Sequence, residues 1–350
     1  MTPLKDDGMA KPVMPQSRSG PDAEASGPTD AAAAGVDPSS THNSQHQPFG
    51  AELEPVLLSA CHQRLSAVNW FRTDWQRGGA LTGYATYIDD SGQPQPVVVK
   101  LPVPPGERQW LERLQAADNV VPKLYAHGET LGGYDLAWVV MERMAHGPLG
   151  SAWGGKEFDL LVQTAGRFYA AAQAYPVTTT PPKRDWDRIF HHAREQVHRH
   201  NLAQEQRWSK ALKKAHRKLK KWLAVWDHRP VDQWCHGDLH LGNAMTRLPP
   251  PQGPAVLIDF AVVHPGHWVE DAVYFEHLYW SRPDRLGGRK FCKAIAHERK
   301  QHGVKVDPDW SRLASVMRAL FAMSTPVMLE QVGDPRHVHA ALEVLEREVE

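Results

Sequence analysis

Three polar side chains in the second half of the chain have the types and spacing of a reaction centre. Asp238 and Asn243 stand five residues apart in the string H-G-D-L-H-L-G-N. On a tight loop this spacing lets a carboxylate and an amide face one point from opposite sides. A second carboxylate, Asp259, closes the apolar run 255–258, which is predicted to be a buried strand. Together the three residues indicate a phosphotransfer centre.

The order of these residues follows a known pattern. In protein kinases the catalytic loop runs H-R-D-L-x-x-x-N, and a later D-F-G supplies a second metal ligand. Here Gly237 replaces the Arg, and Asp259 begins D-F-A. The string H-G-D-x-x-x-x-N followed by I-D-F resembles the aminoglycoside phosphotransferase and choline kinase superfamily, a small-molecule branch of the protein-kinase-like fold.

The resemblance implies an activity and a role for each residue. The chain would be an ATP-dependent kinase that transfers the γ-phosphoryl group to a hydroxyl of a small metabolite or antibiotic, with ATP and Mg²⁺ as cofactors. Asp238 would deprotonate or orient the acceptor hydroxyl, while Asn243 and Asp259 would hold magnesium. His236 is expected to fix the loop by hydrogen bonding, and His240 to lie near the acceptor.

Upstream residues match the nucleotide-binding half of the same pattern. Val97-Val98-Val99-Lys100 resembles the strand whose lysine pairs with the α and β phosphates. Its acidic partner on the next helix is either Glu107 or Glu112, and the distance to Val121-Pro122 favours Glu107. In the turn 75–79, Gly78 and Gly79 would let backbone amides approach the phosphates, although a plain hairpin turn explains the same residues.

Two further segments have counterparts in the superfamily. The apolar run 136–141 resembles the strand that leads into the interlobe hinge, so Met141, Glu142 and Met144 are expected near the adenine. The segment 266–271 occupies the place of G-D-P-x-x-D. Asp271 is therefore predicted to accept hydrogen bonds from the backbone of the catalytic loop.

The nucleotide-binding residues and the catalytic residues lie in different halves of the chain, so two lobes are expected to bring them together. The resemblance implies a bilobal α/β protein-kinase-like fold with a small β-rich N-terminal lobe, 51–147, and a larger helical C-terminal lobe, 148–350. Residues 1–50 are rich in Pro, Ser, Gly, Ala and Asp. Because such a segment cannot bury enough apolar surface to offset chain entropy, we expect a disordered tail.

One region stands out by charge. Residues 183–229 carry fourteen Lys or Arg against five Asp or Glu. Trp208, Leu212, Ala215, Leu219, Trp222 and Trp226 recur at helical spacing, which predicts one buried helix face with the lysines solvated opposite it. Nucleic-acid binding is the alternative reading. If the region lines the acceptor site, polycationic aminoglycosides should be poor acceptors.

Composition also bears on the expected partners and cellular location of the protein. The formal net charge is zero, which favours neither a nucleic-acid nor a membrane partner. The chain has no signal-type segment and no run of eighteen apolar residues, so we expect a soluble, cytoplasmic protein acting on a small molecule. Three scattered cysteines without a CxxC predict neither a disulfide framework nor a cysteine zinc site.

Two alternative functions remain open on the sequence. His236, Asp238 and His240 form H-x-D-x-H, and Asp259 could add a fourth ligand, which would suit a metal-dependent hydrolase. That reading leaves Asn243 and the lysine strand unexplained. The other alternative is a catalytically silent nucleotide-binding pseudokinase, against which the completeness of the motif argues.

Overall fold

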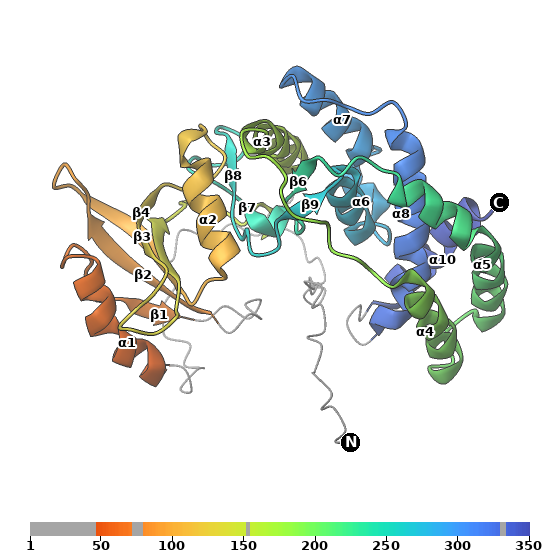
Figure 1. Cartoon of the computed structure of the whole chain (residues 1–350), viewed down its shortest axis with the longest axis horizontal. Helices are drawn as coiled ribbons and strands as arrows, with labels where there is room; N and C mark the ends of the chain where they lie inside the picture. Colours follow the sequence, from red (N-terminus) through yellow and green to blue (C-terminus); the bar gives the residue numbers. More distant parts are fainter. Residues whose placement is uncertain (1–46, 72–79, 152–154, 330–333) are drawn as a thin grey trace, which may run out of the picture.

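An antiparallel sheet of five strands forms the smaller lobe (Figure 1). Its strand order is β1-β2-β3-β5-β4, and helix α2 lies between the sheet and the rest of the molecule. Along β3 the side chains of Val97, Val99 and Leu101 are buried, so the alternating Lys100 projects from the opposite face. The elements of this lobe are α1 (Gln47–Ala60), β1 (Asn69–Phe71), β2 (Leu81–Ile88), β3 (Pro94–Leu101), α2 (Pro105–Arg113), the 3-10 turn η1 (Leu114–Ala116), β4 (Leu124–Gly128) and β5 (Trp138–Glu142).

The larger lobe is helical, with two pairs of very short strands facing the smaller lobe (Figure 1). Strand β6 pairs with β9, and β7 pairs with β8. The elements are η2 (Leu149–Ser151), α3 (Lys156–Ala172), α4 (Trp186–Arg199), α5 (Glu205–Asp227), β6 (Gln233–Cys235), η3 (Leu241–Asn243), β7 (Ala244–Thr246), β8 (Ala255–Leu257), β9 (His264–Gly266), α6 (Val269–Leu278), η4 (Pro283–Leu286), α7 (Phe291–Gln301), α8 (Trp310–Ser324), η5 (Thr325–Met328) and α10 (Pro335–Glu348).

The described residues form two hydrophobic cores, one confined to the smaller lobe and one that extends from the helical lobe to α2 and β5. The smaller core packs the sheet against α1 through residues such as Leu57, Val97 and Trp138. The larger core runs through the helical lobe and includes the buried rings of Phe168 and Trp268. The bilobal protein-kinase-like fold predicted from the motifs is therefore confirmed. The computed structural model describes residues 47–71, 80–151, 155–329 and 334–350, so residues 1–46 of the predicted tail, and also Gly78 and Gly79, lie outside the described residues. The last four residues of the predicted tail, 47–50, instead begin helix α1.

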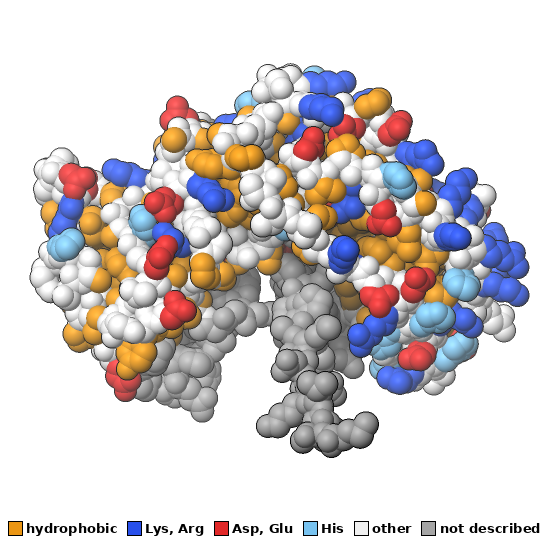
Figure 2. Space-filling model, in the orientation of Figure 1, with side chains coloured by type: hydrophobic (Ala, Val, Ile, Leu, Met, Phe, Trp, Pro, Cys, Tyr) orange, Lys and Arg blue, Asp and Glu red, His pale blue; other side chains and the backbone are white. Residues whose placement is uncertain are grey.

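Helix α5 buries the predicted apolar stripe. Trp208, Leu212, Ala215, Leu219, Trp222 and Trp226 are all buried. The lysines at 210, 213, 214, 220 and 221 are exposed. Figure 1 places α5 at the end of the larger lobe remote from the sheet, and Figure 2 shows Lys and Arg side chains gathered on that edge. No described helix has the length and apolarity needed to cross a membrane.

The apolar periodicity of residues 310–332 predicts one helix with a kink at Pro326, but the structure differs. Helix α8 stops at Ser324, and the chain continues as the 3-10 turn η5 with Pro326 near its start. Proline has no backbone N–H and its ring clashes with the preceding turn, so it ends the α-helix rather than kinking it.

Candidate active site

The loop that carries Asp238 is fixed by Asp271, in the first turn of α6. The backbone N–H groups of His236 and Gly237 each donate to the Asp271 carboxylate at 2.8 Å. The Tyr169 hydroxyl donates to the same carboxylate at 2.8 Å. Asp271 is fully buried. The predicted contact between Asp271 and the backbone of the catalytic loop is confirmed.

The glycine of H-G-D is required by the backbone. Gly237 has φ +82°, in the left-handed region that favours glycine. A Cβ at this position would lie 2.3 Å from the carbonyl oxygen of Val262. Any side chain would therefore push the catalytic loop away from the turn that follows Asp259.

His236 is buried and packs beneath the loop. Its ring lies 4.9 Å from the Phe260 ring and 5.9 Å from the Phe168 ring, and Nδ1 accepts from the Asp238 backbone N–H at 3.3 Å. Burial lowers the pKa of His236 below its ordinary value, which keeps the ring neutral. These contacts fit the expected loop-fixing role of this residue.

Asp238 sits at the centre of a network of hydrogen-bond donors. Oδ1 accepts from the Tyr274 hydroxyl at 2.7 Å and lies 3.3 Å from His240 Nε2, while Oδ2 accepts from Asn243 Nδ2 at 2.9 Å. Burial acts to raise the pKa of Asp238, but His240 and the Tyr274 hydroxyl outweigh it and lower that pKa to about 2. The carboxylate is therefore ionised throughout the neutral range.

Tyr274 was not among the residues predicted for the site. It lies on α6 three residues after Asp271, so both side chains project from the same face of the helix toward the catalytic loop. That helical spacing was the sequence signal that could have identified it. Burial raises the pKa of Tyr274 well above its ordinary value, and the charge of Asp238 raises it further. The hydroxyl is consequently a permanent donor.

The tautomer of His240 follows from its two contacts. Nδ1 accepts from the backbone N–H of Gly242 at 2.9 Å, so it carries no proton. Nε2 therefore carries the ring proton and presents it toward Asp238. This arrangement orients His240 as a donor at the carboxylate rather than as a base.

Asn243 is fixed through its amide nitrogen. Nδ2 donates both to the carbonyl oxygen of Asp238 at 3.0 Å and to its carboxylate, which leaves Oδ1 as the side-chain atom available to a cation. The carbonyl oxygen of Asn243 accepts from the Ile258 N–H at 3.0 Å. That bond joins the catalytic loop to the strand that delivers Asp259.

Lys100 is where the two lobes meet at the site. Its Nζ lies 2.7 Å from Glu107 Oε1 on α2 and 3.5 Å from Asp259 Oδ1. Of the two glutamates considered, Glu107 contacts the lysine, whereas Glu112 pairs with Arg108. Burial acts to lower the pKa of Lys100, but the two carboxylates outweigh it and raise it, so the ammonium keeps its charge.

Asp259 is held in an unusual backbone conformation. Its φ is +63°, a left-handed value uncommon for a residue with a side chain. The Asp259 side chain is 43% exposed, unlike the buried Asp238. Strained positions of this kind cluster at functional sites. The Asp259 carboxylate is open to solvent, where a ligand could reach it.

The three predicted hinge residues differ in how many of their polar groups already form hydrogen bonds. Met141 lies within β5 and is paired with β3. The Glu142 side chain forms two hydrogen bonds of 2.7 Å with Arg247, and its backbone N–H donates to Lys123. Met144 is buried at the lobe junction, and within the described residues no hydrogen bond occupies its N–H or carbonyl. Its backbone is thus the one left available to a ligand.

The hydrolase alternative lacks a metal cluster. Among the described residues, the ligand atoms of His236, Asp238, His240 and Asp259 do not converge, and the one group of three that does lies elsewhere. His236 Nδ1 accepts a hydrogen bond from the Asp238 N–H, and His240 Nδ1 accepts one from the Gly242 N–H. The arrangement does not support the H-x-D-x-H reading.

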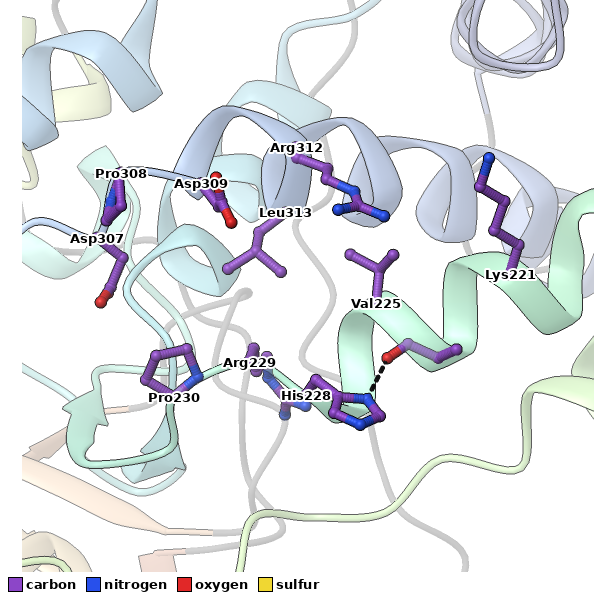
Figure 3. Close-up of a pocket in the computed structure, with 11 residues that line it drawn as sticks. Lys221, Val225, His228, Arg229, Pro230, Asp307, Pro308, Asp309, Arg312 and Leu313 are labelled. Atoms are coloured by element: carbon purple, nitrogen blue, oxygen red, sulfur yellow. Dashed lines mark hydrogen bonds between the residues drawn. The ribbon is translucent and has the colours of Figure 1, made fainter.

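A separate pocket of about 480 Å³ lies between the end of α5 and the start of α8 (Figure 3). Lys221 and Arg312 extend along its rim, and Asp307 and Asp309 line the opposite part. None of the predicted site residues lines it. The pocket therefore lies on other elements than those that carry Lys100, Asp238 and Asp259.

Comparisons with known proteins agree with the motifs. The model of a family described as the phosphotransferase enzyme family matches residues 32–314. An aminoglycoside phosphotransferase from Alicyclobacillus acidocaldarius has a similar structure, with TM-score 0.55 and 16% identity over 83% of this chain and 91% of that one. A candidate aminoglycoside phosphotransferase from Ralstonia eutropha gives TM-score 0.51 and 16% identity over 84% and 96%. No curated protein sequence matches significantly. At such identities the structural likeness shows a shared fold.

Proposed function

The chain belongs to the phosphotransferase enzyme family, and from that premise we propose that it transfers the γ-phosphoryl group of ATP to a hydroxyl of a small molecule. The observation that carries the proposal is the meeting of Lys100, Glu107 and Asp259 across the lobes, opposite the Asp238 network. A cationic phosphate-binding group, a cation-binding carboxylate and an acceptor-binding carboxylate then share one cleft.

The nucleotide side of the cleft is proposed to work by charge. Glu107 holds the Lys100 ammonium in the cleft, where it would bind phosphate oxygens in place of its present 3.5 Å contact with Asp259. Asn243 Oδ1 and the exposed Asp259 carboxylate are hard oxygen donors of the kind Mg²⁺ prefers. When bound, magnesium would neutralise charge on the transferred phosphoryl group.

The acceptor side is proposed to work by positioning. With a pKa of about 2, Asp238 is a weak base but a good hydrogen-bond acceptor for an incoming hydroxyl. Phosphoryl transfer through a loose transition state needs alignment more than early proton removal. Tyr274, His240 and Asn243 fix the carboxylate and so fix the direction from which the hydroxyl attacks.

Nucleotide titrations test the cofactor assignment. Wild-type protein should show a magnesium-dependent rise in melting temperature with ATP. Asp259→Asn should abolish the dependence on magnesium, and Asn243→Ala should weaken it less because one neutral ligand is lost. Asp284→Asn, which removes an exposed carboxylate on η4, is the matched control and should behave as wild type. Equal magnesium dependence in wild type and Asp259→Asn would contradict the assignment.

A metabolite library with MgATP tests turnover. Acceptor-dependent ADP release, abolished by Asp238→Asn, is the expected result. Tight MgATP binding with no ADP release on any hydroxylated acceptor would instead favour the silent pseudokinase.

A further inference from the structure

Cys235, His264 and Glu270 converge behind the catalytic loop from three different elements. Cys235 ends β6 and is the direct cross-strand partner of His264 in β9. Glu270 lies in the first turn of α6. The thiol sulfur, a ring nitrogen and a carboxylate oxygen all lie within 4.8 Å of one another. These three residues are called the rear cluster below.

The contacts of His264 leave its second nitrogen facing an acceptor. Nδ1 lies 2.9 Å from the carbonyl oxygen of Val262, and because a carbonyl only accepts, Nδ1 must carry a proton. Nε2 then lies 3.5 Å from Glu270 Oε2. A lone pair facing a carboxylate is repulsive, so this geometry calls for a positive species between the two atoms, either a second proton or a metal ion.

The backbone packs closely against the cluster. A Cβ on Gly266 would lie 2.7 Å from Glu270 Oε1 and 2.8 Å from Cys235 Sγ, so a side chain at this position would push the carboxylate and the thiol out of place. Glu270 Oε1 is already engaged by the His267 N–H at 2.9 Å and by Arg229 Nε at 3.2 Å. Those bonds orient the carboxylate and leave Oε2 directed toward His264.

We propose that the rear cluster binds one divalent transition-metal ion, with zinc the best match. A thiolate, an imidazole and a carboxylate plus one water make a four-coordinate set of the type zinc accepts. The bond from Nδ1–H to a backbone carbonyl is the outer contact that metal-binding histidines usually make. On binding, the Cys235 thiol would lose its proton to solvent. The partly exposed His264 and Glu270 give the ion a way in.

The ion would have a structural role. It would join β6, β9 and α6, the three elements that hold His236 and Asp271 in register. Cys235 directly precedes His236, so the ion would stiffen the base of the catalytic loop without reaching the phosphoryl-transfer cleft. This site is independent of the proposed kinase activity.

Metal analysis of the full-length protein tests the proposal directly. After dialysis against buffer with zinc and then passage through a desalting column, wild type should retain about one zinc ion per chain. Replacing zinc with Co²⁺ should give the near-ultraviolet absorption of a thiolate–cobalt bond. This spectrum reports cysteine coordination in the wild-type protein, whatever the variants do. No retained zinc and no such absorption would overturn the proposal and leave His264 holding a proton.

Variants locate the site. Cys235→Ser and His264→Gln should each weaken zinc binding by on the order of 100-fold or more, since loss of outer contacts alone costs 10- to 100-fold. Cys292→Ser is the matched control, because Cys292 is equally buried but lies beside Arg318 on another helix, and it should keep zinc and the cobalt band. Circular dichroism checks folding. Zinc retained by folded Cys235→Ser, or lost from folded Cys292→Ser, would place the ion elsewhere and overturn the proposal.

Discussion

At the scale of single residues, Asp238 is surrounded by donors on both carboxylate oxygens. Tyr274 and His240 act on Oδ1 and Asn243 on Oδ2. Such a carboxylate holds its charge and its orientation at the cost of basicity. For a reaction with little proton transfer in the transition state, orientation is the more valuable property.

The first prediction concerns Asp238→Asn. The substitution keeps the side-chain shape but removes the charge that we propose attracts and aligns the acceptor hydroxyl. We expect acceptor-dependent ADP release to fall at least ~10³-fold, within the range that positioning supplies, while the affinity for MgATP changes less than about threefold. Coupled-enzyme assays and isothermal titration measure the two quantities. A variant with near-wild-type turnover would remove Asp238 from the mechanism.

The second prediction uses pH. The pKa of Asp238 in the folded protein, about 2, lies below the ordinary value near 3.9. The contribution of ionised Asp238 to the free energy of unfolding is therefore complete above about pH 4 and is lost as the pH falls toward 2. Tyr274→Phe removes one donor, so the pKa of Asp238 should rise and the acid limb of kcat should move to higher pH.

Turnover of Tyr274→Phe at neutral pH should fall roughly tenfold, the value of a hydrogen bond to a charged group of about 1.5 kcal/mol. A tyrosine of similar burial in the small lobe gives the control, Tyr87→Phe, which should leave the pH profile unchanged. If Tyr274→Phe lowered kcat without moving the acid limb, Tyr274 would serve packing rather than the charge of Asp238.

At the scale of elements, helix α6 positions the catalytic loop through hydrogen bonds that two of its side chains make. Its first turn presents Asp271 to the loop backbone and its next turn presents Tyr274 to Asp238. Helix α2 does the same for Lys100 through Glu107. Short strands alone could not hold these loops, because β6 and β7 have three residues each.

The third prediction tests that role with Asp271→Ala. The change leaves the N–H groups of His236 and Gly237 and the Tyr169 hydroxyl without their acceptor. Unsatisfied buried donors cost about 1–3 kcal/mol each, so the free energy of unfolding should drop by roughly 3 kcal/mol or more. Urea unfolding measures it. Asp309→Ala, at a helix start without a side-chain cap bond, should change it by less than about 0.5 kcal/mol.

The sequence predicts well those features that depend on a few adjacent residues. The catalytic loop, the Lys100 strand and the apolar stripe of α5 are local patterns whose geometry follows from spacing. Tyr274 and the rear cluster depend on how α6 packs against β6 and β9, which no short window contains. Similarly, the sequence does not show which of Met141, Glu142 and Met144 has a backbone free to bind a ligand, because that depends on hydrogen bonds to neighbouring strands.

At the scale of the whole molecule, the basic side chains of α5 are separated from the candidate active site. The basic region 183–229 forms α4 and α5, and the lysines of α5 are exposed at the end of the larger lobe (Figures 1 and 2). The expectation that aminoglycosides are poor acceptors required this charge to line the acceptor site. With the apolar face of α5 turned to the core, its lysines do not support that argument, and the preference among acceptors stays a prediction.

The fourth prediction follows from that separation. Replacing Lys213, Lys214 and Lys220 together by Glu reverses the charge at three exposed positions of α5. At 0.15 M salt the Debye length is about 8 Å, so the change should barely alter the potential in the interlobe cleft. We expect the KM for the acceptor found in the library screen to change less than about twofold. The same positions changed to Gln separate loss of charge from its reversal.

Ionic strength completes this test. At 0.01 M salt the Debye length grows to about 30 Å, and the Glu variant should then alter the KM of a charged acceptor modestly, in the direction given by the acceptor's sign. An effect of tenfold or more at 0.15 M salt would contradict the separation. It would mean that the lysine face of α5 approaches the acceptor during turnover. Repulsion by these lysines would then again explain why polycationic aminoglycosides should be poor acceptors.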